Sequence, residues 1–325
     1  MRVAVVGAGM AGLACAAALR AGGASVAVFD KGQRVGGRLA TRQVDGFRFD
    51  HGAQYASARD PAFRALIDAM VATGDAAVWA DAGATAEVAA ESKRWVGVPG
   101  MSAMAAWMER QGVGTVHVGR HVAFLHRARV GWMVRHADAA GTPPGLVSES
   151  VGEVIGPFDQ VVVAVPGPQV AGLLRDHEFG RAAAGVAMAP CWTLMLGYSG
   201  EHGGADVVRP ASGPLSWVAR KRRAAGVECW VAQAGPDWSA AHLEAPAGLV
   251  HDALLEAFRA ATGVCGVPVY AATHRWRYAR VERPLGEPAL WDAAVGLGVC
   301  GDWCLGARVE AAFLSGRALA RTMLG

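Results

Sequence analysis

The first thirty residues of the chain constrain its fold more than any other stretch. Residues 2–6 form a continuous apolar run rich in β-branched side chains, which is typical of a parallel strand buried on both faces. Gly7, Gly9 and Gly12 then follow in the pattern G-x-G-x-x-G, and residues 11–20 are rich in Ala and Leu without a helix breaker. This order of strand, glycine turn and helix predicts the start of a βαβ unit.

Each part of this pattern has a physical role in binding a dinucleotide. Gly7 permits a tight turn, Gly9 lets the backbone approach a pyrophosphate, and Gly12 lets the helix pack closely on the strand. The helix N-terminus offers free N–H groups and a partial positive charge to the phosphates. A second strand is predicted at 25–29, and Asp30 after it would accept hydrogen bonds from a ribose. Because all these parts agree, we predict a dinucleotide-binding unit.

A second glycine pair narrows the choice of dinucleotide. Gly36 and Gly37 precede Arg38 within the segment 31–38, and residues 50–55 are Asp-His-Gly-Ala-Gln-Tyr. These segments resemble the R-x-G-G-R and D-x-G-A segments of FAD enzymes in the glutathione-reductase and amine-oxidase superfamily. Two glycines and an arginine suit a second phosphate clamp, because a guanidinium is a bidentate partner of phosphate. The resemblance implies FAD rather than NAD as the resident cofactor.

The end of the chain contains a third segment of the same kind. Residues 295–303 predict a buried strand that ends in Gly301-Asp302, and a long helix is predicted at 308–324. This arrangement resembles the C-terminal flavin motif of the same superfamily, in which the Asp binds the ribityl or phosphate end of FAD. A helix N-terminus at the flavin edge would stabilise the negative charge that reduction places there.

The remaining pattern predicts the fold class. Residues 158–166 predict another buried parallel strand, with a helix after it at 168–174. Residues 180–270 instead predict antiparallel strands with a helix at 247–261, and several tryptophans gather there. We therefore predict an α/β fold with a Rossmann-type FAD-binding domain around a parallel sheet. A smaller α+β substrate domain, built on an antiparallel sheet, would cover the flavin.

Both domains are expected to be discontinuous in sequence. The FAD-binding domain is predicted to contain residues 1–65, 106–178 and 271–325. The substrate domain is predicted to contain residues 66–105 and 179–270. A chain of 325 residues is long enough for two such domains sharing a large core.

Composition and charge exclude several classes of protein. Hydrophobic residues make up 53% and charged residues 18% of the chain, which suits a globular enzyme and excludes gross disorder. The net charge is only +3, so we expect no nucleic-acid partner, and the basic run 220–223 is interpreted as a solvated turn. Six cysteines without metal-binding spacing indicate reduced thiols and no metal site. Lacking a signal peptide or a membrane-length apolar run, the protein is expected to be soluble and cytoplasmic, with no membrane partner.

The resemblance extends to one family, the bacterial renalases. The segments that carry it are spread from end to end: Phe29-Asp30-Lys31, Gly36-Gly37-Arg38, Gly52-Ala53-Gln54-Tyr55 with Ala58-Arg59-Asp60, Arg94-Trp95-Val96-Gly97, His274-Arg275-Trp276 with Tyr278-Ala279, Gly301-Asp302-Trp303-Cys304 and Arg308-Val309-Glu310. Residues 81–92 depart from the family in length and sequence. Ala311 also stands where a glycine is usual.

This resemblance implies an FAD oxidase that acts on 2- or 6-dihydro isomers of NAD(P)H. Hydride would pass from the nicotinamide ring to flavin N5, giving β-NAD(P)⁺, and dioxygen would then reoxidise the flavin and yield hydrogen peroxide. Such chemistry needs a flat aromatic site from which water is excluded, and little acid–base machinery, because the cofactor carries the reaction. The expected partners are thus a dihydronicotinamide dinucleotide and O₂, with the chain a monomer or a weak homo-oligomer.

The candidate residues follow from these segments. The predicted catalytic or substrate-contacting residues are Tyr55, Arg59, Trp95, Thr193, His274, Trp276 and Arg308. The predicted cofactor-binding residues are Gly7, Gly9, Met10, Ala11, Gly12, Asp30, Lys31, Gly37, Arg38, Gln54, Tyr55, Val122, Gly301, Asp302, Arg308, Val309 and Glu310. Structural roles remain alternatives, because Trp95 and Trp276 also suit a hydrophobic core and Thr193 may simply pack.

Three other functions remain open. A flavin amine oxidase would take hydride from a small amine, and such enzymes often carry a lysine on the substrate side. This chain has only Lys31, Lys93 and Lys221. A flavin-binding protein without turnover, or a monooxygenase that needs an aromatic co-substrate, would also use the same cofactor motifs. Cys304 lies near the flavin motif, although we expect the FAD to be non-covalent.

Overall fold

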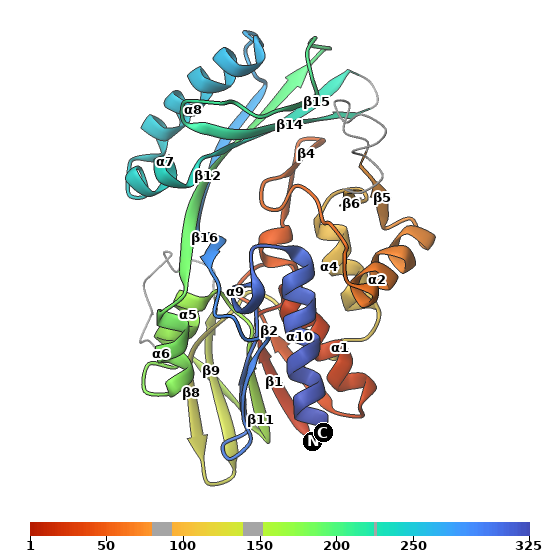
Figure 1. Ribbon diagram of the computed structural model, residues 1–325, viewed down its shortest axis with the longest axis vertical. Helices are drawn as coiled ribbons and strands as arrows, with labels where there is room; N and C mark the ends of the chain where they lie inside the picture. The colour runs from red at the N-terminus through yellow and green to blue at the C-terminus, as the bar shows by residue number, and fades with distance from the viewer. Residues whose placement is uncertain (80–92, 139–151, 224–225) are drawn as a thin grey trace.

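The chain folds into two layers of β-sheet, one above the other, with the two chain ends side by side at the bottom (Figure 1). The computed structural model describes residues 1–79, 93–138, 152–223 and 226–325. Residues 81–92, where the sequence departs from the resembled family, lie outside the described part. A six-stranded sheet forms the lower layer and a five-stranded sheet the upper layer.

The lower sheet has the strand order β17-β18-β11-β1-β2-β7. Its members are β1 (Arg2–Val6), β2 (Ser25–Phe29), β7 (Thr115–His117), β11 (Gln160–Val163), β17 (Leu290–Asp292) and β18 (Leu297–Val299). All neighbours are parallel except β17, which runs antiparallel to β18. The strands predicted from apolar runs near residues 2–6, 25–29, 158–166 and 295–303 therefore share one sheet.

Both faces of the lower sheet are covered, which explains the unbroken apolar runs. Val3 and Val5 pack on one face with α1 (Met10–Ala21) and α10 (Val309–Leu324). Ala4 and Val6 pack on the other face, against the three-stranded sheet of β8 (Arg120–Ala128), β9 (Gly131–Asp138) and β10 (Glu153–Phe158). Near that face also lie α5 (Gly167–Leu173) and α6 (Glu178–Ala184).

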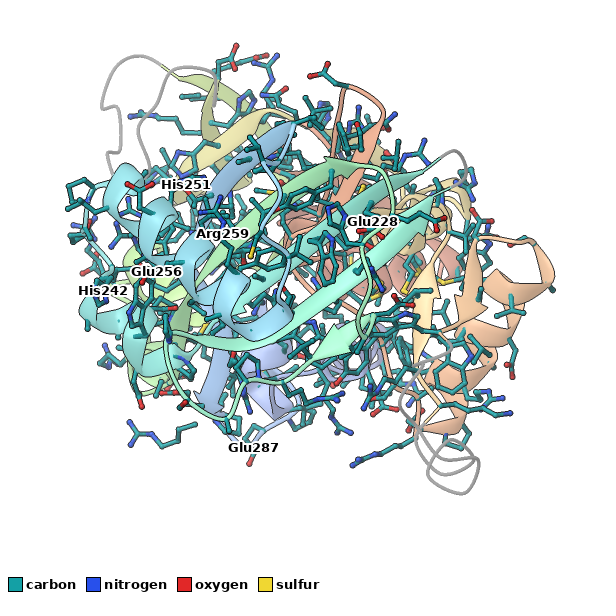
Figure 2. The ribbon with its side chains drawn as sticks, turned by 90° about the horizontal axis from the view of Figure 1, so that it is seen from above. Glu228, His242, His251, Glu256, Arg259 and Glu287 are labelled. Carbon is teal, nitrogen blue, oxygen red and sulfur yellow. The ribbon has the colours of Figure 1, made fainter. Side chains whose placement is uncertain are left out.

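The upper sheet is antiparallel, with the order β13-β14-β15-β12-β16. It contains β12 (Ala187–Ser199), β13 (Val207–Val208), β14 (Leu215–Arg223), β15 (Val227–Ala234) and β16 (Tyr270–Arg283). Its outer face is covered by α7 (Pro236–Ala241) and α8 (Ala247–Thr262), and Figure 2 shows α8 lying across the strands. Its inner face packs on the hairpin of β3 (Thr41–Val44) and β4 (Phe47–Asp50).

A third group of elements fills the side of the molecule next to α1. It consists of η1 (Gly37–Leu39), α2 (Pro61–Ala72), β5 (Ala76–Val78), β6 (Trp95–Gly97) and α4 (Ser102–Arg110), while α9 (Asp302–Leu305) precedes α10. The Asp60 carboxylate caps the start of helix α2, because it accepts hydrogen bonds from Ala62 N (2.8 Å) and Phe63 N (3.4 Å).

The predicted fold class is confirmed: a parallel Rossmann-like sheet lies beside a separate antiparallel sheet. Two segments contact a different layer of the molecule from the one in which the predicted domain boundaries place them. Residues 66–79 and 93–105, the described parts of the segment 66–105, share a hydrophobic core with α1 through side chains such as Ile67 and Met104. Residues 270–283 form β16 and pair with β12 in the upper sheet, although 271–325 was assigned to the lower domain. Periodicity identifies a buried face but not the layer that buries it.

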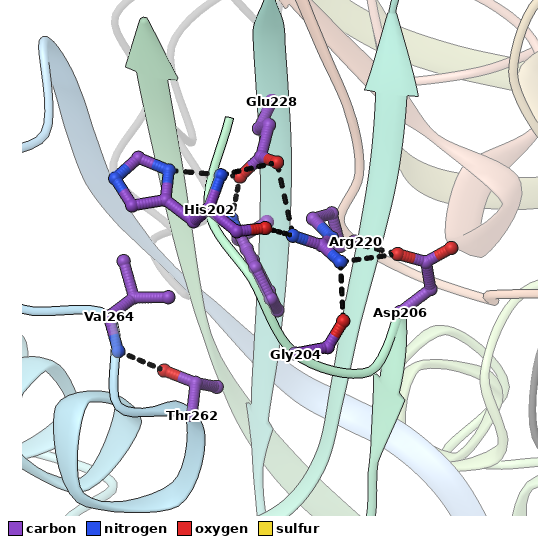
Figure 3. Close-up of polar contacts among 8 residues, drawn as sticks. His202, Gly204, Asp206, Arg220, Glu228, Thr262 and Val264 are labelled. Atoms are coloured by element: carbon purple, nitrogen blue, oxygen red, sulfur yellow. Dashed lines mark hydrogen bonds and ion pairs between the residues drawn. The ribbon is translucent and has the colours of Figure 1, made fainter. Parts of the chain in front are cut away.

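The prediction of a solvated turn at 220–223 is wrong, because these residues belong to β14. Arg220 points to the outer face and is fully buried, where its guanidinium bonds Glu228 (3.0 Å), Asp206 (2.8 Å) and Gly204 O (2.8 Å), as Figure 3 shows. Lys221 points to the inner face and forms an ion pair with the buried Asp50. Successive strand residues alternate between faces, so a run of like charges can serve two different networks.

Candidate cofactor and substrate site

The glycine turn after β1 has two glycines that the protein itself requires and one that it does not. A Cβ on Gly7 would lie 2.5 Å from Ala164 O, and Gly7 has φ of +107°; a Cβ on Gly12 would lie 1.9 Å from Gly7 O. A Cβ on Gly9 would meet no protein atom within 4 Å. Gly9 is the N-cap of α1, so the backbone there is open to a group approaching the helix N-terminus at Met10. This geometry fits a pyrophosphate.

Asp30 lies at the end of β2 beside this turn. Its carboxylate accepts hydrogen bonds from Ala8 N and Gly32 N, both at 2.6 Å, which fixes it against the glycine turn. Burial raises the pKa of the Asp30 carboxyl, although these two bonds act in the opposite direction. Each oxygen accepts one bond and keeps further acceptor capacity, so the residue fits the ribose contact predicted for it. Lys31, the next residue, is exposed.

Arg38 and Asp302, predicted separately as cofactor residues, form a bidentate ion pair with each other. The two guanidinium nitrogens Nη1 and Nη2 lie 2.7 Å from Oδ2 and Oδ1 of Asp302. Arg38 comes from η1 and Asp302 from α9, so the pair joins the second glycine segment to the C-terminal segment. The Arg38 side chain remains 28% exposed, and its remaining N–H groups can donate to a phosphate.

Glu310 is buried and holds two other predicted site residues in place. Its Oε1 accepts hydrogen bonds from Arg59 N (2.5 Å) and Asp60 N (2.7 Å), and its Oε2 pairs with Arg308 Nη1 (3.0 Å). Arg308 is the N-cap of α10, and Val309 is its first residue. Glu310 therefore ties the start of α10 to the segment before α2, which is a positioning role.

Four residues from four strands form a row across the inner face of the upper sheet. Trp217 lies opposite Gln233, Gln233 opposite Thr193, and Thr193 opposite His274. Residues opposite one another on neighbouring strands point to the same face. We call this set the cross-strand row. Thr193 and His274 were predicted from sequence, whereas Trp217 and Gln233 were not, because strand register cannot be inferred from the individual strands.

The cross-strand row lies against residues 51–55, the segment after β4. Gln233 Nε2 donates to Gly52 O (2.7 Å), and the ring centroid of His274 lies 4.8 Å from that of His51. Tyr55 lies 6.0 Å from Trp217 between ring centroids. The same segment contacts the cofactor residues, because Ala53 N donates to Arg38 O (2.8 Å). The structure thus brings both the row and Arg38 into contact with one short segment, residues 51–55.

Further aromatic rings extend this surface. Trp276 Nε1 donates to His51 O (2.8 Å), and its ring stacks on His51 with centroids 5.3 Å apart. Trp79 lies 5.9 Å from Tyr55 and 6.0 Å from Trp217. Tyr55 and Trp217 also lie under the guanidinium groups of Arg94 (4.8 Å) and Arg209 (4.6 Å). The surface is therefore rich in aromatic rings: His51 and Trp276 are stacked, whereas Tyr55, Trp79 and Trp217 are tilted relative to one another.

The two histidines of this surface, His51 and His274, are uncharged near pH 7. Burial lowers the pKa of both His51 and His274 from 6.5 to about 4, and the nearby Arg42 acts in the same direction. Burial also raises the pKa of the Cys191 thiol to about 11. An ion pair near residue 51 joins Asp50 to Lys221, and Asp50 also accepts bonds from Thr41 Oγ1 (2.5 Å) and Met101 N (2.8 Å).

The other predicted site residues support the segment rather than line the row. Gln54 is buried and donates to Asp50 O and to Gly52 O (3.3 Å). Trp95 is buried in the core beside α1, with Arg64 over its ring at 4.7 Å. Val122 on β8 is buried opposite His136. Cys304 is fully buried, and burial raises its pKa.

Two negative findings apply to the described residues. In those ranges, His, Cys, Asp and Glu side chains form no group of three or more that could hold a metal ion. None of the helices described there is long and apolar enough to cross a membrane.

Sequence comparison supports the N-terminal unit. A family model described as an NAD(P)-binding Rossmann-like domain matches residues 5–70. Among curated relatives, 4,4'-diapophytoene desaturase of Staphylococcus haemolyticus is 54% identical over 52 residues, and that of Staphylococcus aureus strain Newman is 48% identical over 52 residues. The match spans 16% of this chain and only 10% of either desaturase.

Structural comparison covers the whole chain at low identity. A protein titled "Putative protoporphyrinogen oxidase" from Exiguobacterium sp. 255-15 matches with a TM-score of 0.76 and 12% identity over 99% of this chain and 98% of its own. Putrescine oxidase bound to putrescine matches at 0.65 and 16% over 99% of both chains. Cyclohexylamine oxidase from Brevibacterium oxydans IH-35A matches at 0.67 and 12% over 99% and 98%. At such identities the likeness shows the fold alone.

Proposed function

We propose that this protein is an FAD-dependent oxidase that takes hydride from 2- or 6-dihydro isomers of NAD(P)H and delivers the electrons to dioxygen, giving β-NAD(P)⁺ and hydrogen peroxide. The observation that carries the proposal is the cross-strand row facing residues 51–55. It forms an aromatic surface with two uncharged histidines, His51 and His274, close to the Arg38–Asp302 pair. The proposal also includes non-covalent binding of the FAD.

The residues that would hold FAD fit that cofactor in two places. The open backbone at Gly9, with Asp30 beside it, suits the adenosine end and the pyrophosphate. Arg38 and Asp302 form a second polar anchor next to residues 51–55. Bound FAD would supply the hydride acceptor and the route to dioxygen.

The chain's own residues would then orient the substrate ring. Tyr55 and Trp217 offer aromatic faces for a planar ring. Gln233 donates from Nε2 to Gly52 O and keeps its Oε1 as an acceptor, which suits the N–H groups of a carboxamide. His274 is neutral at pH 7 and therefore does not repel the cationic nicotinamide ring that forms as the product. Acid–base catalysis is not required of any of them.

Amine oxidation is the second candidate, and one observation favours it. Lys221, which the sequence placed in a turn, lies on the inner face of the upper sheet and pairs with Asp50, one residue before His51. The small number of lysines in the chain is thus a weaker argument against amine oxidation than the sequence alone indicates. Two proteins of similar fold are named as oxidases of amines.

Anaerobic mixing of the flavin-loaded protein with 2-, 4- and 6-dihydronicotinamide dinucleotides decides between these functions. We expect fast loss of flavin absorbance with the 2- or 6-isomer alone, followed by peroxide when air is readmitted. A Gln233→Leu variant should weaken substrate binding about tenfold or more, while Thr322→Ala, far along α10, should not. Reduction by putrescine or cyclohexylamine but by no dinucleotide would move the assignment to amine oxidase. No reduction by either class would support a flavin-binding protein without turnover.

A further inference from the structure

A second polar cavity lies outside the candidate cofactor and substrate site. It has a volume of about 250 Å³ and lies between α4 and the β3–β4 hairpin. Arg34 enters it from the loop before Gly36, Arg48 from β4, and Arg110 from α4. None of its lining residues belongs to the glycine turn, to the cross-strand row or to residues 51–55.

The charges around this cavity are unbalanced. Three guanidinium groups line it together with one carboxylate, that of Asp75, which pairs with Arg110 at 2.5 Å. Among the described residues, neither Arg34 nor Arg48 has an ion pair in the structure. Two positive charges therefore converge on one cavity without a counter-charge there, and such a site attracts an anion.

The arginines, and not the nearby helix end, would provide the hydrogen bonds. Ser102 N at the start of α4 already donates to Thr41 Oγ1 (3.0 Å), and Met101 N donates to Asp50 (2.8 Å). Gln43, which is exposed on β3, adds a neutral side-chain amide to the lining. The remaining donors include the guanidinium forks of Arg34 and Arg48, the Gln43 amide and the Ser102 hydroxyl, and such a set suits an oxyanion with several oxygens.

We propose that this cavity binds a small phosphate-bearing molecule. A phosphate group presents three terminal oxygens and can accept bidentate bonds from two guanidinium groups at once, which a single carboxylate does less well. Ligand pockets for whole drug-sized molecules are roughly 300–1,000 Å³, so this cavity suits one phosphate with a small organic part and not a dinucleotide. The site is separate from the flavin, and the proposal does not depend on the reaction assigned above.

Calorimetric titration of the flavin-loaded protein with inorganic phosphate tests this proposal, with sodium chloride holding the ionic strength constant. We expect saturable binding, and we expect Arg34→Gln and Arg48→Gln each to weaken it about tenfold or more. Arg129→Gln is the matched control. Arg129 is exposed in the turn between β8 and β9, so this substitution removes the same charge far from the cavity. The control should bind phosphate within about twofold of the parent.

Several results would overturn the proposal. Equal phosphate affinity in the parent and both cavity variants would show that phosphate binds elsewhere, and equal heat with chloride alone would show general screening. Acetate binding as tightly as phosphate would replace the phosphate class with carboxylates. The flavin absorbance spectrum should stay unchanged during the titration, which separates this site from cofactor displacement. All three variants alter exposed or partly buried side chains, so their thermal unfolding should match that of the parent and exclude misfolding.

Discussion

His51 and His274 are the two histidines of the candidate substrate surface. Each ring is removed from water, and burial holds its pKa near 4, so both rings are neutral under ordinary conditions. They contact one another edge to face, at 4.8 Å between centroids, and protonating both would place two like charges in contact. Uncharged histidines suit the proposed substrate, because a dihydronicotinamide ring becomes cationic on oxidation.

The free energy of unfolding should therefore depend on pH between about 6.5 and 4. A histidine whose folded pKa is lowered binds more protons when unfolded, so stability is complete above pH 6.5 and falls as the pH drops toward 4. Two such groups could together contribute up to about 6 kcal/mol, and solvent penetration would make the observed loss smaller. Urea unfolding at pH 7, 6 and 5 should show the loss, and His274→Gln should reduce its slope. An unchanged slope in that variant would show that His274 protonates freely in the folded state.

At the scale of single elements, the segments that the sequence predicts well are those in which local signals suffice. Helix α1, with its glycine turn, and helix α2, with its Asp60 cap, depend on residues within one or two turns. The cross-strand row depends on the register between four strands that are distant in sequence, and no local signal specifies it. Arg220 and Lys221 illustrate the same limit, since only the sheet shows that they face opposite ways. The Arg38–Asp302 contact was likewise beyond prediction, although both residues were identified.

Two substitutions in the glycine turn should have opposite effects. Gly12→Ala should lower the stability of the cofactor-free protein by about 2–3 kcal/mol or prevent folding, because its Cβ would overlap Gly7 O. Gly9→Ala should leave that stability within about 1 kcal/mol of the parent, because its Cβ would meet only open space. The same Cβ should weaken FAD binding about tenfold or more. Thermal unfolding without FAD and fluorescence titration with FAD measure the two effects. Unchanged FAD affinity in Gly9→Ala would exclude a pyrophosphate at this turn.

At the scale of the whole molecule, the two layers are connected by strands and by buried polar contacts. Val186 and Val281, at the lower ends of β12 and β16, belong to the core of the lower layer. Trp192 and Leu194, further along β12, belong to the core of the upper layer. Asp50 and Lys221 add an ion pair between the β3–β4 hairpin and the upper sheet.

Removing this ion pair from one side should destabilise the fold. Lys221→Met leaves the buried Asp50 carboxylate with only its bonds to Thr41 and Met101, so we expect a loss of about 2–4 kcal/mol in urea unfolding. Lys93→Met, at an exposed position, is the matched control and should change stability by less than about 0.5 kcal/mol. Adding Asp50→Asn to Lys221→Met should restore part of the lost stability, because the double variant no longer buries an unpaired carboxylate. An unaltered unfolding curve in Lys221→Met would show that the pair does not join the layers.

The long strands β12 and β16 also determine whether the chain could be cut into two fragments that each fold. Strand β12 contributes Met188 to the lower core and Trp192 to the upper core, and β16 pairs with β12 while placing Val281 in the lower core. A cut in either strand would therefore disturb both layers. A fragment carrying only the glycine turn and its parallel strands would expose the lower core, and a fragment carrying only the upper sheet would lack the anchored ends of its longest strands. We therefore expect the chain to be inherited and recombined as one unit. Its substrate preference should change through point substitutions in the cross-strand row and not through exchange of a module.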